Sequence, residues 1–502
     1  MRAYSLVPVL FLCGLGISQP LDSTASDSLR TSSTWPREES DWVRKVLALN
    51  PDIASQKLSL QSTRVEGEFA RRGRLPQWTF TGEAAAYPDA RDPVVVGGVP
   101  VLAGQKEWAT EAGAGVKQVL PTGGEIEAGA VAGYQKSKQG VARDTQTVHL
   151  SARQPLWKGR GKYADPQMAV ALSGIDESAA MADLRARILD IITQARTRYW
   201  NLLLKARQLQ SLQADSAYWA QSMLSADAQY RLGDLSEEDF LRFRIQNLGA
   251  RQSLLEGGQA FRQALEEALK LLGPDAEYPA DRAYHADAAR ILKNQGLALD
   301  DDYSRLPAEP KPGDNAMAEH YPTVQKLARL LEKNELQRER AQNQRWPQLD
   351  LEATWNKPIE GRSDSRIAAV FSWTIPALSA GRDLRQLLLQ AKIQRLDSSQ
   401  AAMEVKAAMA RLRDQYGIQK ERFLLASEKV ALERQRSLIA QRRHEMGDIS
   451  FTELQLSARD RLQAEQDAAT AYVALRILVA EIEAWNGESL AAADIGIEGE
   501  IP

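Results

Sequence analysis

Cysteine is almost absent from this chain, since Cys13 is the only one among 502 residues. A single cysteine cannot form a disulfide framework, so packing or assembly must stabilise the fold. After the first residues, no uncharged apolar run approaches the roughly 20 residues of a membrane-spanning helix. An excess of one charge is lacking as well, because 63 basic residues are balanced by 66 acidic ones. This balance argues against nucleic-acid binding, which needs a concentrated basic face.

Catalytic and metal-binding patterns are missing too. The four histidines, which are far apart and lack metal-ligand spacing, are His149, His285, His320 and His444. The glycine pairs at 97–98 and 123–124 have the character of turns and do not form a phosphate-binding loop between a strand and a helix. No nucleophile occupies a recognisable elbow. We therefore expect no catalytic, cofactor or metal site.

The first 18 residues have the pattern of a secretory signal peptide. Arg2 supplies a positive charge, Leu6 to Leu15 form a short apolar stretch, and Gly16 and Ser18 are small residues suited to cleavage. Lipidation at Cys13 is the alternative, but the preceding Leu12 is larger than the small residue that usually stands there. We expect an exported chain without a lipid anchor.

The sequence contains an internal duplication. Pro51 and Pro76 bracket a helical stretch in the first half, and Pro322 and Pro347 bracket another in the second, both pairs being 25 residues apart. Two further landmarks recur in the same order. They are a Gly-Arg pair, at Gly159 and Gly381, and a Gly-Asp turn followed by serine, at Gly233-Asp234-Leu235-Ser236 and Gly447-Asp448-Ile449-Ser450. The predicted organisation is a first repeat at 41–272, a linker at 273–313, a second repeat at 314–486 and a mobile tail at 487–502.

Each repeat predicts a helix, a strand region, a very long helix, a tight turn and another helix. In the second repeat, apolar residues alternate with polar ones, as expected for half-buried strands of a membrane barrel; these residues are Leu349, Leu351, Ala353, Trp355, Ile367, Ala369, Phe371, Trp373 and Ile375. Trp346, Trp355 and Trp373 are candidates for the aromatic belts at the membrane interfaces.

The long helices are expected at about 164–230 and 383–446, where apolar residues step by three and four. Each has nearly the combined length of its two flanking helices, which are expected at 41–72 and 237–272 in the first half and at 318–344 and 451–485 in the second. Two short helices placed end to end would therefore match one long antiparallel partner. Such rods need neighbours, because their apolar stripes must be covered.

Taken together, these ordered and duplicated landmarks resemble those of the TolC family of outer-membrane efflux proteins, from about Asp41 to Trp485. The resemblance implies a mainly α fold with a membrane β-barrel portion, in which duplicated strand–long-helix repeats form a trimeric β-barrel and an α-helical periplasmic tunnel. It implies a homotrimer in the outer-membrane lipid, extending into the periplasm. It also implies a passive duct for efflux or type I secretion that docks to a periplasmic membrane-fusion adaptor and an inner-membrane RND or ABC pump.

The resemblance places the turns at Gly233 and Gly447 at the periplasmic tip. Glu453 matches a gating acid of the family, Asp239 is its counterpart in the first half, and Asp234 and Asp448 lie in the turns themselves. Three-fold symmetry would turn each inward acid into a ring of three, which attracts cations. The family's second acid falls at Leu456 here, and a solvated helix-start acid is the alternative for Glu453. The strand–helix junctions are expected at Pro76, Pro347, Gly159 and Gly381.

The first half departs from the second in length. About 83 residues separate Pro76 from Gly159, against 34 between Pro347 and Gly381. The excess predicts an extra hairpin at about 112–135, and the segment 88–104 predicts an extracellular loop. Four barrel strands per chain is the family expectation, and the sequence leaves open whether the extra hairpin joins the wall. A periplasmic coiled-coil adaptor or structural rod without a pore is the competing hypothesis; an enzyme on a helical scaffold is the third.

Overall fold

The structure, a computed structural model, describes residues 39–86, 94–96, 99–101, 106–137, 142–273, 288, 321–359, 362–372, 378–446 and 448–486. The expected signal peptide, most of the linker, and the tail lie outside these residues. The chain divides into two compact units, one comprising Met1–Ala48 and Asn201–Asp302, the other Leu49–Trp200 and Tyr303–Pro502.

The order of elements confirms the predicted duplication, since helix, strands, long helix and helix occur twice. The first half contains α2 (Glu39–Leu49), α3 (Pro51–Arg72), β1 (Gln77–Ala86), β2 (Val94–Val96), β3 (Val99–Val101), β4 (Lys106–Val119), β5 (Glu125–Ser137), β6 (Ala142–Pro155), the 3-10 turn η1 (Gly161–Tyr163), α4 (Asp165–Leu232) and α5 (Glu237–Lys270). The second contains α8 (Pro322–Asn343), β7 (Gln348–Pro358), β8 (Asp364–Ser372), α9 (Leu378–Glu445) and α10 (Phe451–Trp485).

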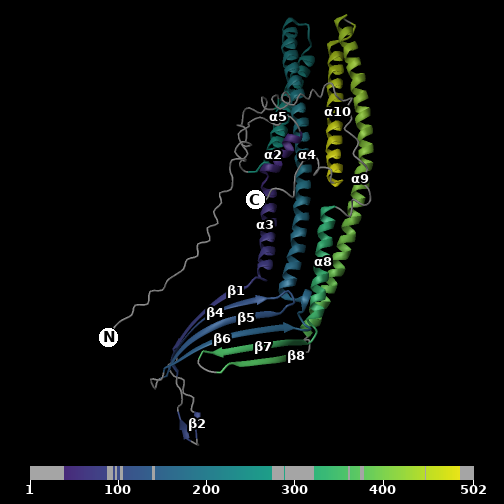
Figure 1. The fold of residues 1–502 in the computed structure, drawn as a ribbon. Helices are drawn as coiled ribbons and strands as arrows, with labels where there is room; N and C mark the ends of the chain where they lie inside the picture. The colour runs from purple at the N-terminus through teal and green to yellow at the C-terminus, as the bar shows by residue number, and fades with distance from the viewer. Residues whose placement is uncertain are drawn as a thin grey trace, which may run out of the picture. The chain divides into compact units, whose positions relative to one another are not determined.

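Six strands form one antiparallel sheet in the order β1-β4-β5-β6-β7-β8 (Figure 1). The extra hairpin is β4–β5, and it lies between β1 and β6 as part of the sheet. The sheet of this chain therefore has six strands, two more than the four of the family expectation, because it includes the inserted hairpin. Between β1 and β4, β2 and β3 pair as a separate small hairpin within the segment expected to be a loop.

The sheet has one apolar and one polar face, since directly opposed residues share a face. The apolar face includes Trp78, Phe80, Ala114, Val116, Ile126, Val148, Leu150, Leu351, Trp355, Ile367 and Phe371. The polar face includes Thr79, Thr81, Glu83, Glu111, Lys117, Glu125, Glu127, His149, Arg153, Asp350, Glu352, Thr354 and Arg366. Phe80 and Ile367 are 80% and 82% exposed, so no described residue covers the apolar face at these two positions.

In the second half, two shorter helices lie end to end along one long helix, as predicted. Val324 of α8 packs against Val405 of α9, and farther along α9, Val430 packs against Ala464 and Ala468 of α10. Where α8 begins and α10 ends, Tyr321 stacks on Trp485 with ring centroids 4.6 Å apart. The pair continues the apolar core across the break between the helices.

The helix expected at 41–72 is interrupted at Asn50, which is a correction to the sequence prediction. The side chain of Asn50 accepts hydrogen bonds from the backbone N–H groups of Asp52 and Ile53, and Pro51 follows it. An N-cap followed by proline starts a new helix instead of continuing the old one. In one unit, α3 then runs antiparallel to the start of α4, where Arg64 pairs with Glu177 at 2.9 Å.

In the other unit, the last part of α4 forms an antiparallel hairpin with α5. Tyr230 stacks on Phe240 close to the turn, with centroids 4.7 Å apart, and Trp219 contacts Phe243. Gly257 lies so close to Leu212 that an added Cβ would approach its methyl group to 2.4 Å. A small residue is therefore required where these two helices meet.

Ion pairs join the two repeats where α8 lies beside α4. Lys326 pairs with Asp183 at 2.8 Å, Lys333 pairs with Asp176 at 2.6 Å, and Arg340 pairs with Asp165. The three cations are spaced by seven residues, so they line one face of α8. Each of these partly exposed pairs contributes about 0–1 kcal/mol, and together they favour one register of two antiparallel helices.

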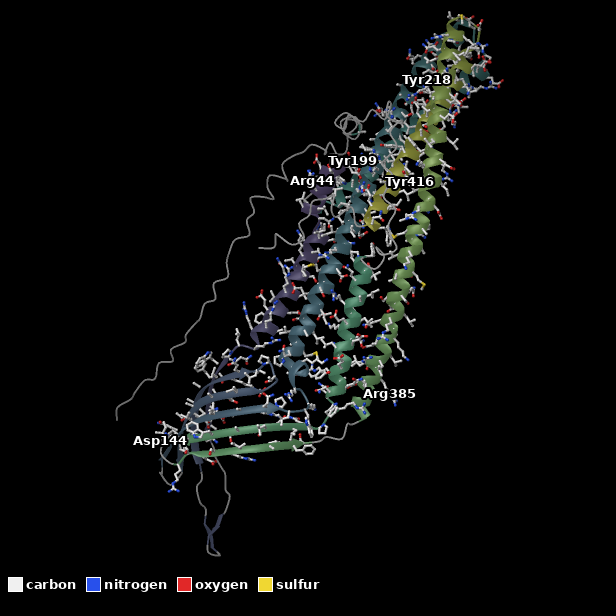
Figure 2. All side chains as sticks on the ribbon, turned by 45° about the vertical axis from the view of Figure 1, so that its right-hand side comes forward. Arg44, Asp144, Tyr199, Tyr218, Arg385 and Tyr416 are labelled. Carbon is white, nitrogen blue, oxygen red and sulfur yellow. The ribbon has the colours of Figure 1, made fainter. Side chains whose placement is uncertain are left out.

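Aromatic side chains mark the buried interior of the helical part. Tyr199 on α4 and Tyr416 on α9 are both buried, whereas Arg385 lies near the start of α9 and Asp144 at the end of the sheet away from the helices (Figure 2). Among the described residues, none of the helices combines the length and apolar character needed to span a bilayer.

Glu481 on α10 yields a prediction about stability. It lines a hollow of about 230 Å³ beside Gln415 and Gln419 of α9, and burial raises the pKa of its carboxyl group, although the nearby charge of Arg411 lowers it. The folded protein therefore holds this proton more tightly than the unfolded chain, and the contribution of Glu481 to stability falls as pH rises above its ordinary pKa. We expect Glu481→Gln to raise the thermal unfolding midpoint at pH 8.

The gain should shrink toward pH 4, where the carboxyl group is protonated in both states. Unfolding followed by circular dichroism in detergent at several pH values measures it, with the exposed Glu421→Gln as the matched control. A pH-independent gain, or the same gain in the control, would show that burial of Glu481 is not the cause.

Candidate functional site

The strand–helix junction of the first half is tied to the turn of the inserted hairpin. The turn at Pro121-Thr122-Gly123-Gly124 is closed by a hydrogen bond from the Leu120 N–H to the Gly124 carbonyl at 2.7 Å. The Thr122 hydroxyl donates to Gln154 at 2.8 Å, and the Gly161 N–H donates to the Thr122 carbonyl at 3.0 Å. The turn of the hairpin is thus fixed to the end of β6 and to η1.

The structure places the four residues predicted at strand–helix junctions as follows. Pro76 and Pro347 directly precede β1 and β7. Gly159 has a left-handed φ of 75°, and its N–H donates to the Asn343 side chain at the end of α8, at 2.9 Å. Gly381, in contrast, is already inside α9, which begins at Leu378. The two Gly-Arg pairs are therefore not equivalent in structure.

Charged side chains on the polar face of the sheet form a network across strands. Lys117 of β4 pairs with Glu125 of β5 at 3.0 Å, and His149 of β6 lies 3.8 Å from Glu127. Arg153 of β6 donates from Nε to Asp350 of β7 at 2.8 Å. These residues were not predicted as site residues, although their alternation with apolar neighbours is the signal that identifies them.

Asp350 is the most enclosed member of this network, with a side chain only 2% exposed. Its Oδ2 accepts hydrogen bonds from Arg153 and from Gln348, the latter at 2.7 Å. Arg153 also reaches Glu352, at 3.6 Å. One guanidinium thus serves two carboxylates where β6, from the first repeat, meets β7, from the second. A buried carboxylate must be paired in this way to remain charged.

The first predicted tip turn closes α4 through a left-handed glycine. Gly233 has a φ of 83°, and the Asp234 N–H donates to the Gln229 carbonyl at 3.0 Å, the bond pattern of a Schellman cap. Ser236 then caps α5, because its hydroxyl accepts a bond from the Asp239 N–H at 3.1 Å. The Asp239 carboxylate accepts from the Ser236 hydroxyl at 2.7 Å and also binds Arg242, at 3.4 Å.

The second tip turn has a parallel geometry. The Asp448 N–H donates to the Arg443 carbonyl at 2.8 Å, while Gly447 itself lies outside the described residues. Ser450 and Glu453 form a capping box at the start of α10, in which each side chain accepts from the other's backbone N–H, at 3.3 and 3.4 Å. Glu453 therefore has a structural role that any further role must accommodate. Leu456, at the position of the family's second acid, is exposed.

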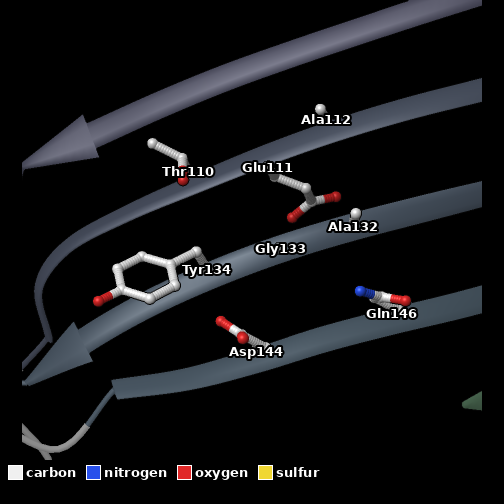
Figure 3. A pocket seen from close by; sticks show the side chains of 8 residues that line it. All are labelled: Thr110, Glu111, Ala112, Ala132, Gly133, Tyr134, Asp144 and Gln146. Atoms are coloured by element: carbon white, nitrogen blue, oxygen red, sulfur yellow. The ribbon is translucent and has the colours of Figure 1, made fainter. Parts of the chain in front are cut away.

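A shallow hollow of about 270 Å³ lies across β4, β5 and β6, toward the end of the sheet away from the helices (Figure 3). Its lining residues are Thr110, Glu111, Ala112, Ala132, Gly133, Tyr134, Asp144 and Gln146. Among the described residues, no group of three or more His, Cys, Asp or Glu side chains is placed to hold a metal ion. His285 and His320 lie outside those residues.

Gly123 provides a test of the junction. It has a φ of 87°, and an added Cβ would approach the Gly159 carbonyl oxygen to 2.5 Å and the Ala164 methyl group to 2.9 Å. We expect Gly123→Ala to destabilise the protein by about 1–3 kcal/mol, because the backbone strain and the clash add. Thermal unfolding in detergent measures the loss.

Gly82→Ala is the matched control, since an added Cβ at Gly82 meets nothing within 4 Å. Equal stability of Gly123→Ala and Gly82→Ala would refute the view that the hairpin turn is locked to the junction.

Comparison with known proteins supports the fold. No protein-family model matches the sequence, and no curated protein matches it significantly. Among solved structures, the chain is similar to the outer-membrane channel OprN, with a TM-score of 0.61, 17% identity, and coverage of 93% of this chain and 96% of that one.

It is also similar to the open state of the MtrE outer-membrane channel of Neisseria gonorrhoeae, with a TM-score of 0.63, 13% identity, and coverage of 90% and 89%. For the CmeC outer-membrane channel of Campylobacter jejuni, the TM-score is 0.62 at 12% identity, with coverage of 90% and 86%. The predicted fold class is confirmed: over nine-tenths of its length the chain has the fold of outer-membrane channel proteins.

Proposed function

We propose that this chain is one protomer of a homotrimeric outer-membrane channel, the passive exit duct of a tripartite efflux or type I secretion system. The observation that carries the proposal is the six-stranded sheet with one apolar and one polar face. Such a sheet suits a barrel wall with lipid outside and water inside. The fold shared with outer-membrane channels supports the same function.

The dimensions of the apolar face agree with a bilayer. On β6, the apolar residues Val148, Leu150 and Ala152 lie between Gln146 and Gln154 on the same face. The distance along the strand from Gln146 to Gln154 is about 27 Å at ~3.4 Å per residue. A strand tilt of about 40° reduces the height between these two polar residues to about 21 Å. Transmembrane barrels carry an apolar band about 25 Å tall. Polar residues thus return where the interfaces would lie.

The helices supply the periplasmic part of the proposed duct. α4 and α9 each contain 68 residues, which corresponds to roughly 100 Å of helix. α9 leaves a row of large apolar residues exposed in the single chain, among them Leu389, Ile393 and Leu396. Neighbouring copies in a trimer would cover such a row. A periplasmic rod without a pore, the competing hypothesis, offers no reason for an amphipathic sheet between the helices.

The partners follow from this assignment. A passive duct has no energy source of its own, so cargo must be delivered by an inner-membrane RND or ABC pump through a periplasmic membrane-fusion adaptor. We place the turns at Gly233 and Gly447 at the periplasmic tip, where the adaptor would dock. Asp234, Asp239 and Asp448 would surround the mouth, and Glu453 would line its constriction.

The first test of the channel is its location and mass. We expect the protein in the outer-membrane fraction after envelope fractionation, and native mass spectrometry of the detergent-extracted particle should give three times the protomer mass. A soluble periplasmic monomer would reject the channel and favour the rod.

A charge gate at Glu453 is tested with two variants. Glutamine at the third helical position still completes a capping box, whereas alanine removes both the cap and the charge. If Glu453 lines the mouth, both Glu453→Gln and Glu453→Ala should weaken block by divalent cations in planar-bilayer recordings, because a ring of three charges is lost. Only Glu453→Ala should also lose stability, by about 0.5–2 kcal/mol.

Unchanged conductance and block in Glu453→Gln would leave Glu453 as a helix cap alone. Glu433→Gln, on α9, is a control for the loss of one carboxylate elsewhere in the same hairpin.

A further inference from the structure

Among the described strands, β1 and β8 form the two edges of the sheet, and each pairs with a neighbour on one side only. A membrane interior offers no water to their backbone N–H and C=O groups, and six strands are fewer than the eight of the smallest membrane barrels. In an antiparallel sheet with an even number of strands, the two edges run in opposite directions. The β8 edge of one copy can therefore pair antiparallel with the β1 edge of the next.

We propose that three copies close into a barrel of eighteen strands, and that Arg366 of each copy meets Glu83 at the edge of its neighbour. This inference rests on the proposed homotrimeric channel and adds its strand number, its closing contact and its width. At a strand spacing of about 4.8 Å and a tilt of about 40°, eighteen strands give a backbone-to-backbone diameter of about 36 Å. Twelve strands, four from each chain, would give about 24 Å.

An uncompensated pair of charges marks the β1 edge. Glu83 of β1 is directly opposite Glu111 of β4 on the polar face, and like charges in this position repel. Among the described residues, neither has an ion-pair partner, and both are exposed. The other edge carries the complement, because Arg366 of β8 lies on the same polar face, exposed and also without an ion-pair partner among those residues.

The strand register predicts where these groups meet. Successive opposed pairs lead across the sheet from Gln77 at the edge of β1, through Lys117, Glu127, Ser151 and Thr354, to Arg366 at the edge of β8. This line climbs away from the helices, since Gln77 directly follows Pro76 whereas Thr354 is seven residues beyond Pro347. In a closed barrel the climb is set by the strand tilt.

A strand tilt of about 35–45° shifts the line of opposed residues by about six to nine residues along the strand direction for every six strands crossed. Only even shifts keep polar side chains on one face. A shift of six places Arg366 opposite Glu83 of the next copy, and a shift of eight places it opposite Ala85, with Glu83 at the diagonal position. Arginine reaches either neighbour, so in both registers it compensates the Glu83–Glu111 pair.

Cysteine cross-linking tests this contact in the full-length protein. Cys13→Ser removes the natural cysteine, and Arg366→Cys is combined with Glu83→Cys or, separately, with Ala85→Cys. Within one chain these positions are at opposite edges of a six-stranded sheet, about 24 Å apart, so a disulfide must join two copies. We expect one of the two combinations to give covalent dimers and trimers in isolated outer membranes after mild oxidation.

Ala84→Cys with Arg366→Cys is the control, because Ala84 lies on the opposite face of the sheet and should not cross-link. Trimers in the outer membrane with no cross-link in either combination would overturn the closure while leaving the channel intact. Absence of trimers from the outer membrane would instead reject the proposed channel, and this inference with it.

A charge exchange gives a second readout. Arg366→Glu should lower the temperature at which the trimer dissociates in sodium dodecyl sulfate, because the introduced carboxylate then faces those of Glu83 and Glu111 in the neighbouring copy. Adding Glu83→Arg should restore most of the loss. Failure of the exchange to restore it would show that Arg366 and Glu83 do not meet.

The place of the inserted hairpin in the wall is tested by labelling β4. We expect cysteine at Gly115, on the polar face, to react with a water-soluble maleimide, and cysteine at Ala114, on the apolar face, to be protected in membranes. Equal labelling of the two positions would exclude β4 from the barrel and return the count to twelve strands.

Discussion

The backbone hydrogen bonds of the sheet are the constraint on which the rest of the structure depends. Within the sheet every strand from β4 to β7 has partners on both sides, whereas β1 and β8 each have a partner on one side only. In water such edges are tolerated, but in lipid each unmet polar group costs several kcal/mol. The side chains of both edges give the same indication: large apolar residues such as Phe80 and Ile367 project from the apolar face, where no described residue covers them. In the proposed channel, pairing with further copies would therefore complete the sheet that the single chain begins.

The helices also need cover, but for their apolar side chains and not for their backbone hydrogen-bonding groups. In water their backbones are satisfied, so only apolar side chains require cover. Each long helix buries one row of them against its shorter partners, as Val405 and Val430 show on α9. The contact between α4 and α8 differs in kind, since ion pairs such as Lys333–Asp176 line it. Such pairs contribute little free energy but favour one register. Long paired helices need register as well as stability, because a slip of one heptad would misalign the strands that follow α8 and precede α4.

Sequence reasoning recovered the elements whose side chains alternate strongly and left open the position of the inserted hairpin, which is rich in small residues. The strand pattern of Leu349 to Trp355 and the N-caps Ser236 and Ser450 were readable because apolar or capping residues occur at the required spacing. The position of the hairpin in the sheet could not be read from the sequence. Alanine and glycine occupy central positions on both faces of β4 and β5, so the pattern does not show which face is apolar. Gly381 lies within α9, whereas Gly159 precedes the 3-10 turn η1, so the shared Gly-Arg pair did not indicate that the two positions differ. The role of the tip acids is harder to predict. Glu453 has the sequence pattern of a helix cap, and this local pattern does not indicate which groups would face it from other copies in the proposed trimer.

The small residues of the inserted hairpin, which left its position in the sheet open, also indicate what the hairpin contributes. On the polar face its central positions are Gly113, Gly115 and Gly129, and side chains of neighbouring strands lean over them. An added Cβ at Gly113 would approach the Thr81 hydroxyl to 2.7 Å, and one at Gly129 would approach the His149 ring to 2.4 Å. The glycines thus leave room for the polar groups that the neighbouring strands β1 and β6 carry on this face. In the proposed channel the insertion would lengthen the wall, and its glycine positions would add no side chains to the inner surface, whereas Glu111, Lys117, Glu125 and Glu127 of the same hairpin would project into the passage.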